Sequence, residues 1–167
     1  IELKFFAEQD ISAELATRLQ PWLLEPQSEV QLGNIYFDTP ERQLRNWDCG
    51  LRIRSKNGQR EQTLKTRGLS AGGLHQRGEF NTPVAGEWPQ LADFPAQVWP
   101  EGTNVQALQE SLRPQFRTDF RRRYWLVEYQ GSRIELAFDQ GVIAVEERRE
   151  PLCERELELV DGKADAL

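Results

Sequence analysis

Basic side chains recur at strand spacing between Cys49 and Arg67, in the stretch CGLRIRSKNGQREQTLKTR, and residues so spaced could bind phosphate. The central Asn57-Gly58 pair predicts a hairpin with a two-residue type I′ turn, because that turn needs a positive φ at both positions. The two-residue turn also fixes the register, so Arg52 is predicted to oppose Thr63, Arg54 to oppose Glu61 and Gly50 to oppose Lys65. Opposed residues point to the same side, and alternate side chains along a strand share a face of such a hairpin. One face then carries Arg52, Arg54, Lys65 and Arg67, and the other carries Leu51, Ile53 and Leu64. A half-buried hairpin with its polar face in water fits this pattern. The more specific hypothesis is that the basic face binds phosphate.

Acidic side chains gather on the last predicted strand, Arg148–Val160. Glu154, Glu156 and Glu158 alternate along one side of it, and Glu2 could join them if the first and last strands are neighbours. Like charges in a row need water or a cation between them, and Mg²⁺ prefers carboxylate oxygens. For any one glutamate a solvated surface position is the simpler interpretation, whereas the set favours a metal site.

The elements that must position these side chains are mostly strands. Alternating apolar and charged residues predict about eight strands. They are Ile1–Phe6, Val30–Asp38, the two strands around Asn57-Gly58, Leu74–Val84, Gln115–Tyr129, Arg133–Val145 and Arg148–Val160. Helical spacing of apolar residues predicts helices over Asp10–Leu24 and Val105–Leu112. The fold class is therefore predicted to be mainly β (α+β).

The two longest strands are predicted to form a second hairpin around Gly131-Ser132, with a type II′ turn. This turn would oppose Glu128 to Glu135 and Tyr124 to Asp139, with Arg122 on the same charged face. Two opposed glutamates repel unless a cation or a basic group lies nearby. A solvated pair at the end of a strand is an equally good explanation of the same residues.

Two architectures satisfy strands that are apolar on one side and charged on the other. In a β-sandwich the charges face solvent, and nothing follows about function. In a closed eight-stranded antiparallel β-barrel with helices packed outside, the charges line the bore. The apolar stripes of the two predicted helices could cover such a barrel, so the closed tunnel is the predicted architecture.

Composition narrows the classes of partner and location. The net charge of −6 argues against a general nucleic-acid or membrane-surface binder. The sequence has no apolar run long enough for a membrane span and no signal-peptide pattern. Cys49 and Cys153 lack metal-ligand spacing and are expected to be free thiols, so a cytoplasmic location is expected. Only four of the 21 basic residues are lysines, and this arginine bias suits forked recognition of phosphate.

The order of several motifs resembles that of the CYTH family, the triphosphate tunnel metalloenzymes. The motifs are Glu2-Leu3-Lys4, Tyr36-Phe37-Asp38-Thr39-Pro40, Leu51-Arg52-Ile53-Arg54, Leu64-Lys65-Thr66-Arg67-Gly68 and Glu154-x-Glu156-Leu157-Glu158. The resemblance covers essentially the whole chain, and it is greatest to the bacterial inorganic triphosphatases of this family. Members of that subgroup often carry a CHAD domain after the CYTH domain.

The resemblance implies hydrolysis of inorganic triphosphate to pyrophosphate and phosphate, with Mg²⁺ or Mn²⁺ bound inside a charged tunnel. The implied substrate-binding residues are Lys4, Arg52, Arg54, Lys65, Arg67, Arg77 and Arg122. The implied metal-binding residues are Glu2, Glu154 and Glu156, supported by Glu158 and Asp139. Lys65 and Tyr36 are the implied catalytic residues, because residues at their places in relatives have been implicated in activating the attacking group.

Two departures and several alternatives accompany this resemblance. The family's first motif is Glu-x-Glu-x-Lys, whose first glutamate would precede Ile1, and a late helix and strand would follow Leu167. Residues 1–167 are therefore expected to be a single CYTH domain that is truncated at both ends. The alternatives are a class IV adenylate cyclase, a thiamine triphosphatase and a non-catalytic polyphosphate-binding module.

Overall fold

The structure, a computed structural model, describes residues 2–67, 69–71, 74–76 and 78–167. Its strands in these residues are β1 (Glu2–Phe6), β2 (Ser28–Asp38), β3 (Gly50–Lys56), β4 (Gln59–Lys65), β5 (Leu69–Ala71), β6 (Leu74–Gln76), β7 (Glu79–Pro83), β8 (Arg113–Tyr129), β9 (Ser132–Val145) and β10 (Arg148–Asp161). Its α-helices are α1 (Ser12–Leu19), α2 (Gln43–Asn46) and α3 (Val105–Ser111). Short 3₁₀ turns lie at Gln20–Trp22, Leu91–Asp93, Ala96–Val98 and Ala164–Ala166. The fold is mainly β, as predicted, and none of the described helices is long and apolar enough to cross a membrane.

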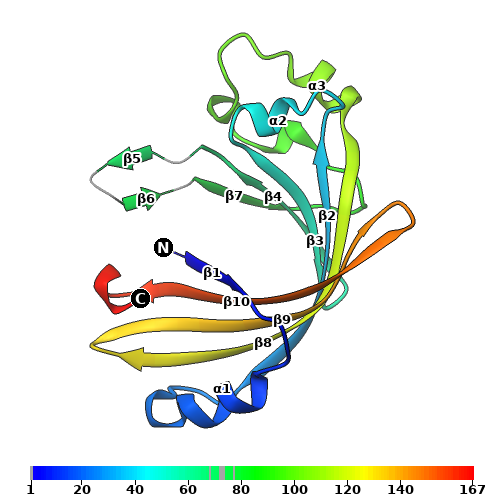
Figure 1. Cartoon of the computed structure of the whole chain (residues 1–167). Helices are drawn as coiled ribbons and strands as arrows, with labels where there is room; N and C mark the ends of the chain where they lie inside the picture. The colour runs from blue at the N-terminus through cyan, green and yellow to red at the C-terminus, as the bar shows by residue number, and fades with distance from the viewer. Residues whose placement is uncertain (1, 68, 72–73, 77) are drawn as a thin grey trace. The chain divides into compact units, whose positions relative to one another are not determined.

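Eight strands are hydrogen-bonded in the order β1-β10-β9-β8-β2-β3-β4-β7, and β5 pairs with β6 in a separate two-stranded sheet (Figure 1). The pairs β1–β10, β3–β4 and β4–β7 are antiparallel. Within the described residues the order has two end strands, β1 and β7. This pairing therefore confirms the eight-stranded sheet but does not show the closed barrel that the sequence predicts.

The chain divides into two compact units, and each has its own apolar core. Unit 1 comprises Ile1–Leu32, Asp119–Ile143 and Arg149–Leu167, and unit 2 comprises Gly33–Thr118 and Ala144–Arg148. Strands β2, β8, β9 and β10 each contribute residues to both units.

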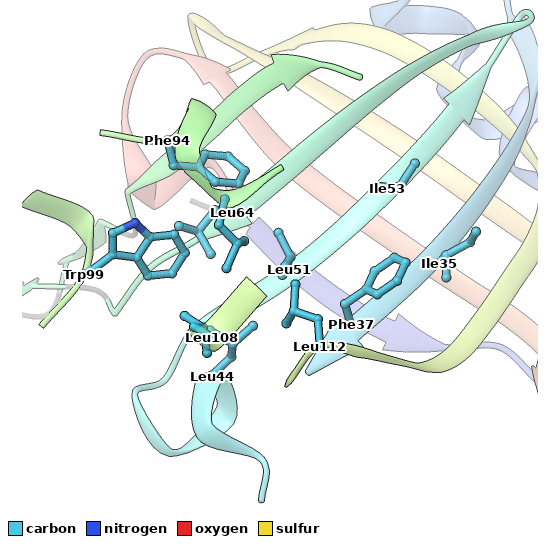
Figure 2. Packing of buried hydrophobic residues seen from close by; sticks show 11 residues of the cluster. Ile35, Phe37, Leu44, Leu51, Ile53, Leu64, Phe94, Trp99, Leu108 and Leu112 are labelled. Atoms are coloured by element: carbon cyan, nitrogen blue, oxygen red, sulfur yellow. The ribbon is translucent and has the colours of Figure 1, made fainter. Parts of the chain in front are cut away.

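The β3–β4 hairpin of unit 2 has the predicted turn and register. Asn57 has a φ of 50° and Gly58 a φ of 77°, as a type I′ turn requires. The register opposes Arg52 to Thr63, Arg54 to Glu61 and Gly50 to Lys65. The apolar face of this hairpin consists of Leu51, Ile53 and Leu64. It is buried against side chains of β2, α2, α3 and the segment between β7 and α3 (Figure 2). A one-residue slip would exchange this face for the basic one, so core burial fixes the register.

The core of unit 1 forms around Trp125 and Phe138, both fully buried. Leu15 and Leu19 of α1 pack against this cluster, as their helical spacing predicts. The α-helix is shorter than the predicted Asp10–Leu24, because it ends at Leu19 and continues as a 3₁₀ turn that contains Pro21. Proline lacks an N–H for the α-helical hydrogen bond and clashes with the preceding turn, which accounts for the early end.

The second hairpin forms, but its predicted turn and register are wrong. β8 ends at Tyr129 and β9 begins at Ser132, so the turn is Gln130-Gly131, with φ values of 50° and 70°. These positive values at both positions fit a type I′ turn rather than the predicted type II′ turn at Gly131-Ser132. Counted from this turn, Arg122 rather than Tyr124 opposes Asp139. The predicted opposition of Glu128 to Glu135 does not follow, because the same count places Arg133 opposite Glu128.

Close approach of β8 to β9 within unit 1 makes Gly141 a sensitive position. A methyl group added there would overlap the carbonyl oxygen of Asp119 and lie 2.5 Å from Cα of Phe120. We expect Gly141→Ala to lower the free energy of unfolding by about 1–3 kcal/mol, the usual cost of overpacking. The measurement is the urea midpoint. Gly50→Ala is the matched control, because an added methyl there meets nothing within 4 Å. Equal midpoints for the two variants would contradict this packing.

Candidate functional site

Basic and acidic side chains of β1 and β10 meet in unit 1. The strand register opposes Lys4 to Glu156, and the Lys4 Nζ lies 2.6 Å from the Glu156 carboxylate. The same Nζ lies 3.1 Å from Glu154, two residues away on β10. Lys4 is partly exposed, whereas both glutamate side chains are largely buried. One ammonium group thus holds two carboxylates of the predicted metal-binding set close together.

Arg122 joins this cluster from β8. Its Nε donates to one carboxylate oxygen of Asp139 at 2.8 Å, and its Nη2 donates to the other at 2.6 Å. The same Nη2 also donates to Glu156. Asp139 is only 2% exposed, so its charge depends on this two-pronged contact.

Three carboxylates of unit 1 offer a set of ligand atoms for a cation. One oxygen from each of Asp139, Glu154 and Glu156 lies within 4.8 Å of the others. Carboxylate oxygens are the ligands that Mg²⁺ and Mn²⁺ take in proteins, so the donor set fits such an ion. Glu2 and Glu158 oppose each other next to the Lys4–Glu156 pair on the β1–β10 ladder, and both are exposed. The structure therefore brings three of the five predicted metal ligands together and places the other two at exposed positions of the β1–β10 ladder.

Burial and ion pairing act against each other in this cluster. Burial raises the pKa of Glu156, but Arg122 and Lys4 outweigh it and hold that pKa below its ordinary value. Burial also raises the pKa of Asp139, and here it outweighs the contact with Arg122. The pKa of Lys4 and of Arg122 is raised, because their carboxylate partners outweigh burial. Three ionised carboxylates against two cations leave a net negative charge at the site, which attracts a further cation.

Unit 2 carries the basic face of the β3–β4 hairpin. Arg54 donates through Nε to the Asn34 side-chain oxygen of β2 at 2.8 Å. The Lys65 Nζ lies 3.3 Å from the carboxylate of Glu79 on β7, which the sequence reasoning did not single out. Burial raises the pKa of Glu79, but the charge of Lys65 and a hydrogen bond from Asn81 outweigh it and lower that pKa.

Two buried polar atoms of this hairpin lack a hydrogen bond among the described residues. Arg52 and Thr63 oppose each other on β3 and β4. Within the described residues, neither the buried Arg52 Nε nor the buried Thr63 hydroxyl makes a hydrogen bond. A buried polar group that lacks a partner costs about 1–3 kcal/mol, so this pair suits an added acceptor such as a phosphate oxygen. Thr63 was missed by the sequence reasoning, although its register opposite Arg52 was predicted.

Arg67 and Tyr36, two further predicted residues of unit 2, have contacts of their own. β4 ends at Lys65, and Arg67 beyond it lines a pocket of about 760 Å³ with Trp47, Phe80 and Trp99. Tyr36 stacks on Phe116, with ring centroids 4.4 Å apart. Arg77, a predicted substrate-binding residue, lies outside the described residues.

Replacing Arg122 tests the buried cluster. Arg122→Met leaves the buried Asp139 carboxylate without its cation and leaves Glu156 with Lys4 alone, and we expect the free energy of unfolding to fall by about 3–5 kcal/mol at neutral pH. Adding Asp139→Asn should recover part of this loss, because an amide needs no counter-charge. Urea midpoints measure both effects.

Arg121→Met is the matched control, because Arg121 is exposed and its ion pair with Glu29 is long, at 3.8 Å. We expect it to change stability by less than about 0.5 kcal/mol. Lowering the pH toward about 4 should narrow the gap between Arg122→Met and the parent, because the low native pKa of Glu156 stabilises the fold only at higher pH. If Arg122→Met unfolds at the urea concentration of Arg121→Met, the cluster does not stabilise the fold.

The whole chain is similar to proteins of one known family. A family model described as CYTH domain matches residues 1–167. An inorganic triphosphatase of Haemophilus influenzae is 39% identical over 172 residues, which cover all of this chain and 47% of that protein. The chain thus spans about half the length of the curated relative that it matches.

Solved structures show the same fold at low identity. HpAC1 of Hippeastrum, described as having a dominant triphosphatase activity, matches with a TM-score of 0.57 at 18% identity, over 96% of this chain and 79% of that chain. A protein of Pyrococcus horikoshii matches with a TM-score of 0.56 at 18% identity, over 99% of this chain and 80% of that chain. At these identities the structures support the fold alone.

Proposed function

Because the chain belongs to the CYTH family, we propose that it hydrolyses inorganic triphosphate to pyrophosphate and phosphate in a metal-dependent reaction. The observation that carries the proposal is the cluster of Asp139, Glu154 and Glu156 held between Lys4 and Arg122. Such a cluster combines ligands for a divalent ion with cations for phosphate. The 39% identity to a protein named inorganic triphosphatase supports the choice of substrate.

The proposed metal ligands are Asp139, Glu154 and Glu156, with Glu2 and Glu158 in support and Mg²⁺ or Mn²⁺ as the ion. A bound divalent ion would neutralise phosphate charge in the transition state. Arg122 fixes the Asp139 carboxylate by its two-pronged contact, and Lys4 fixes the glutamates of β10. These basic residues thus hold the ligand oxygens in place and offer positive charge to a phosphate.

The proposed substrate-binding residues are Lys4, Arg52, Arg54, Lys65, Arg67, Arg77 and Arg122. Forked guanidinium groups bind phosphate oxygens in pairs, and the unpartnered Arg52 Nε supports this role. Lys65 and Tyr36 are the proposed catalytic residues. The Lys65 ammonium would orient the attacking water or stabilise the developing charge, and the Tyr36 hydroxyl would assist it.

The proposal includes the closed form of the sheet, because charged residues alternate with apolar ones along its strands. We also propose that residues 1–167 form a single CYTH domain of a longer protein. In that protein a CHAD domain would follow the CYTH domain. The curated relative extends well beyond the matched region, which supports a further domain. A cytoplasmic location is proposed because neither Cys49 nor Cys153 forms a disulfide bond.

A phosphate-release assay tests the activity. With Mg²⁺ or Mn²⁺ present, we expect inorganic triphosphate to be hydrolysed faster than ATP or thiamine triphosphate, and excess EDTA should abolish release. Glu156→Gln removes one proposed ligand charge and should lower kcat by at least about tenfold, with partial recovery at high Mg²⁺. Triphosphate binding without metal-dependent release would indicate a polyphosphate-binding module instead.

Lys65→Ala tests the proposed catalytic residue. Loss of a group that stabilises the transition state should lower kcat by about 10²- to 10³-fold. Lys56→Ala, at the exposed end of β3, is the matched control and should retain the parent rate. Wild-type turnover by Lys65→Ala would exclude Lys65 from catalysis while leaving the activity itself intact.

A further inference from the structure

Arg52 of β3 and Thr63 of β4 form a cross-strand pair on the charged face of the β3–β4 hairpin in unit 2. They oppose each other in the strand register, and residues so opposed have Cβ atoms about 5 Å apart on the same side of the sheet. Thr63 is only 1% exposed, whereas Arg52 is partly exposed. The fold therefore places a hydroxyl beside a guanidinium and shields that hydroxyl almost completely from water.

Both side chains of this pair have a donor without an acceptor among the described residues. These donors are the buried Arg52 Nε and the buried Thr63 hydroxyl. In unit 1, Arg122 uses its Nε together with Nη2 to bind both oxygens of the Asp139 carboxylate. Arg52 leaves the Nε of the same edge without such an oxyanion. A buried donor without a partner is unfavourable, so two of them at one place indicate an acceptor from outside the chain.

The chemistry of the two donors defines that acceptor. A guanidinium only donates, whereas a hydroxyl donates and accepts, so one oxygen beside Arg52 and Thr63 would accept from both. A phosphate oxygen suits this place, because its charge strengthens the hydrogen bonds that it accepts. Asn81 opposes Thr63 from β7, but it is exposed and its Nδ2 donates to Glu79.

The charge of Arg52 is already shared with a carboxylate. Glu79 interacts electrostatically with Arg52, and its carboxylate lies 3.3 Å from the Lys65 Nζ. A phosphate subsite at this pair therefore does not depend on an uncompensated positive charge. It depends on the two donors, to which Glu79 makes no hydrogen bond in the described part of the chain.

We propose that Thr63 is a substrate-binding residue whose hydroxyl donates to the phosphate oxygen that the Arg52 Nε binds. This inference rests on the proposed function, because it adds a neutral donor to the binding of triphosphate. The hydroxyl fixes the position of one phosphate oxygen relative to the guanidinium. Since the contact is made in the bound substrate and is kept during hydrolysis, it acts on KM rather than on kcat.

The test is steady-state hydrolysis of inorganic triphosphate with Mg²⁺ by the full chain carrying Thr63→Val. Valine keeps the shape of threonine but cannot donate, so we expect KM to rise about tenfold while kcat stays within about twofold. Thr63→Ser keeps the hydroxyl and should hold KM within about twofold of the parent value. If Thr63→Val does not fold, Thr63→Ala removes the same hydroxyl and takes its place.

Urea midpoints without triphosphate separate a phosphate from a bound water, which also accepts two hydrogen bonds. A hydroxyl whose partner is the substrate is unsatisfied in the free protein, so Thr63→Val should unfold at or above the parent midpoint. Loss of a structural water would instead lower the midpoint and leave KM at the parent value. Thr82→Val is the matched control. The Thr82 hydroxyl accepts a hydrogen bond from Gln62 on the other face of the sheet, so its loss should lower the midpoint without changing KM.

A double-mutant cycle tests whether Thr63 and Arg52 bind the same oxygen. Arg52→Lys keeps a charge but lacks the Nε edge. Adding Thr63→Val to Arg52→Lys should therefore raise KM by less than about threefold, because the oxygen that both residues hold is no longer fixed.

Three results would overturn the inference. They are a parent-like KM for Thr63→Val, a KM for Thr63→Ser as high as that of Thr63→Val, and additive effects of Thr63→Val and Arg52→Lys. A parent chain that binds triphosphate without hydrolysing it would refute the proposed activity but not the role of Thr63. The Kd of inorganic triphosphate by calorimetry then replaces KM in the same comparisons, and a parent chain without affinity for triphosphate overturns the inference as well.

Discussion

The contact of Arg122 with Asp139 and Glu156 is the interaction on which unit 1 depends. Its three residues come from β8, β9 and β10, which are neighbours in the sheet. Burying three carboxylates together is unfavourable unless cations are fixed among them, and the rigid fork of an arginine serves that purpose better than a flexible ammonium. The same contact that makes the cluster stable also keeps its oxygens converged for a divalent ion.

The residues that stabilise the fold and the charged residues thus lie on opposite faces of the strands. The apolar faces form the cores, and the opposite faces carry the charges. Leu51, Ile53 and Leu64 are buried while Arg52 and Arg54 lie on the other side of the hairpin. Because the side-chain period of a strand is two, the core holds the charged residues in register without touching them. The charged face can therefore tolerate a donor without a hydrogen-bond partner, such as the Thr63 hydroxyl, because burial of the apolar face stabilises the strand.

The two hairpins show what sequence can predict and where it fails. Asn57-Gly58 leaves one choice of turn, and its register was predicted residue by residue. Gly131 can serve either as the first residue of a type II′ turn or as the second of a type I′ turn. That choice depends on distant contacts, because the Ser132 hydroxyl accepts the Lys163 N–H and Arg122 pairs with Asp139. The predicted charged face of this hairpin is nevertheless unchanged. The predicted and observed registers differ by two residues, and a shift of two leaves each side chain on the same face.

The type of a residue did not by itself predict its role on β2. Asp38 and Asn34 lie on one face of β2, and both are buried. The Asp38 carboxylate accepts hydrogen bonds from the backbone N–H groups of Thr39, Leu44 and Arg45. It therefore stabilises the first turn of α2. Asn34 instead contacts the guanidinium of Arg54. The charged residue of this pair therefore serves the fold, whereas the neutral one contacts a basic side chain of the β3–β4 hairpin. Residue type does not separate these two roles, because both residues are buried on one face of β2 and differ in the partners that the fold brings to them.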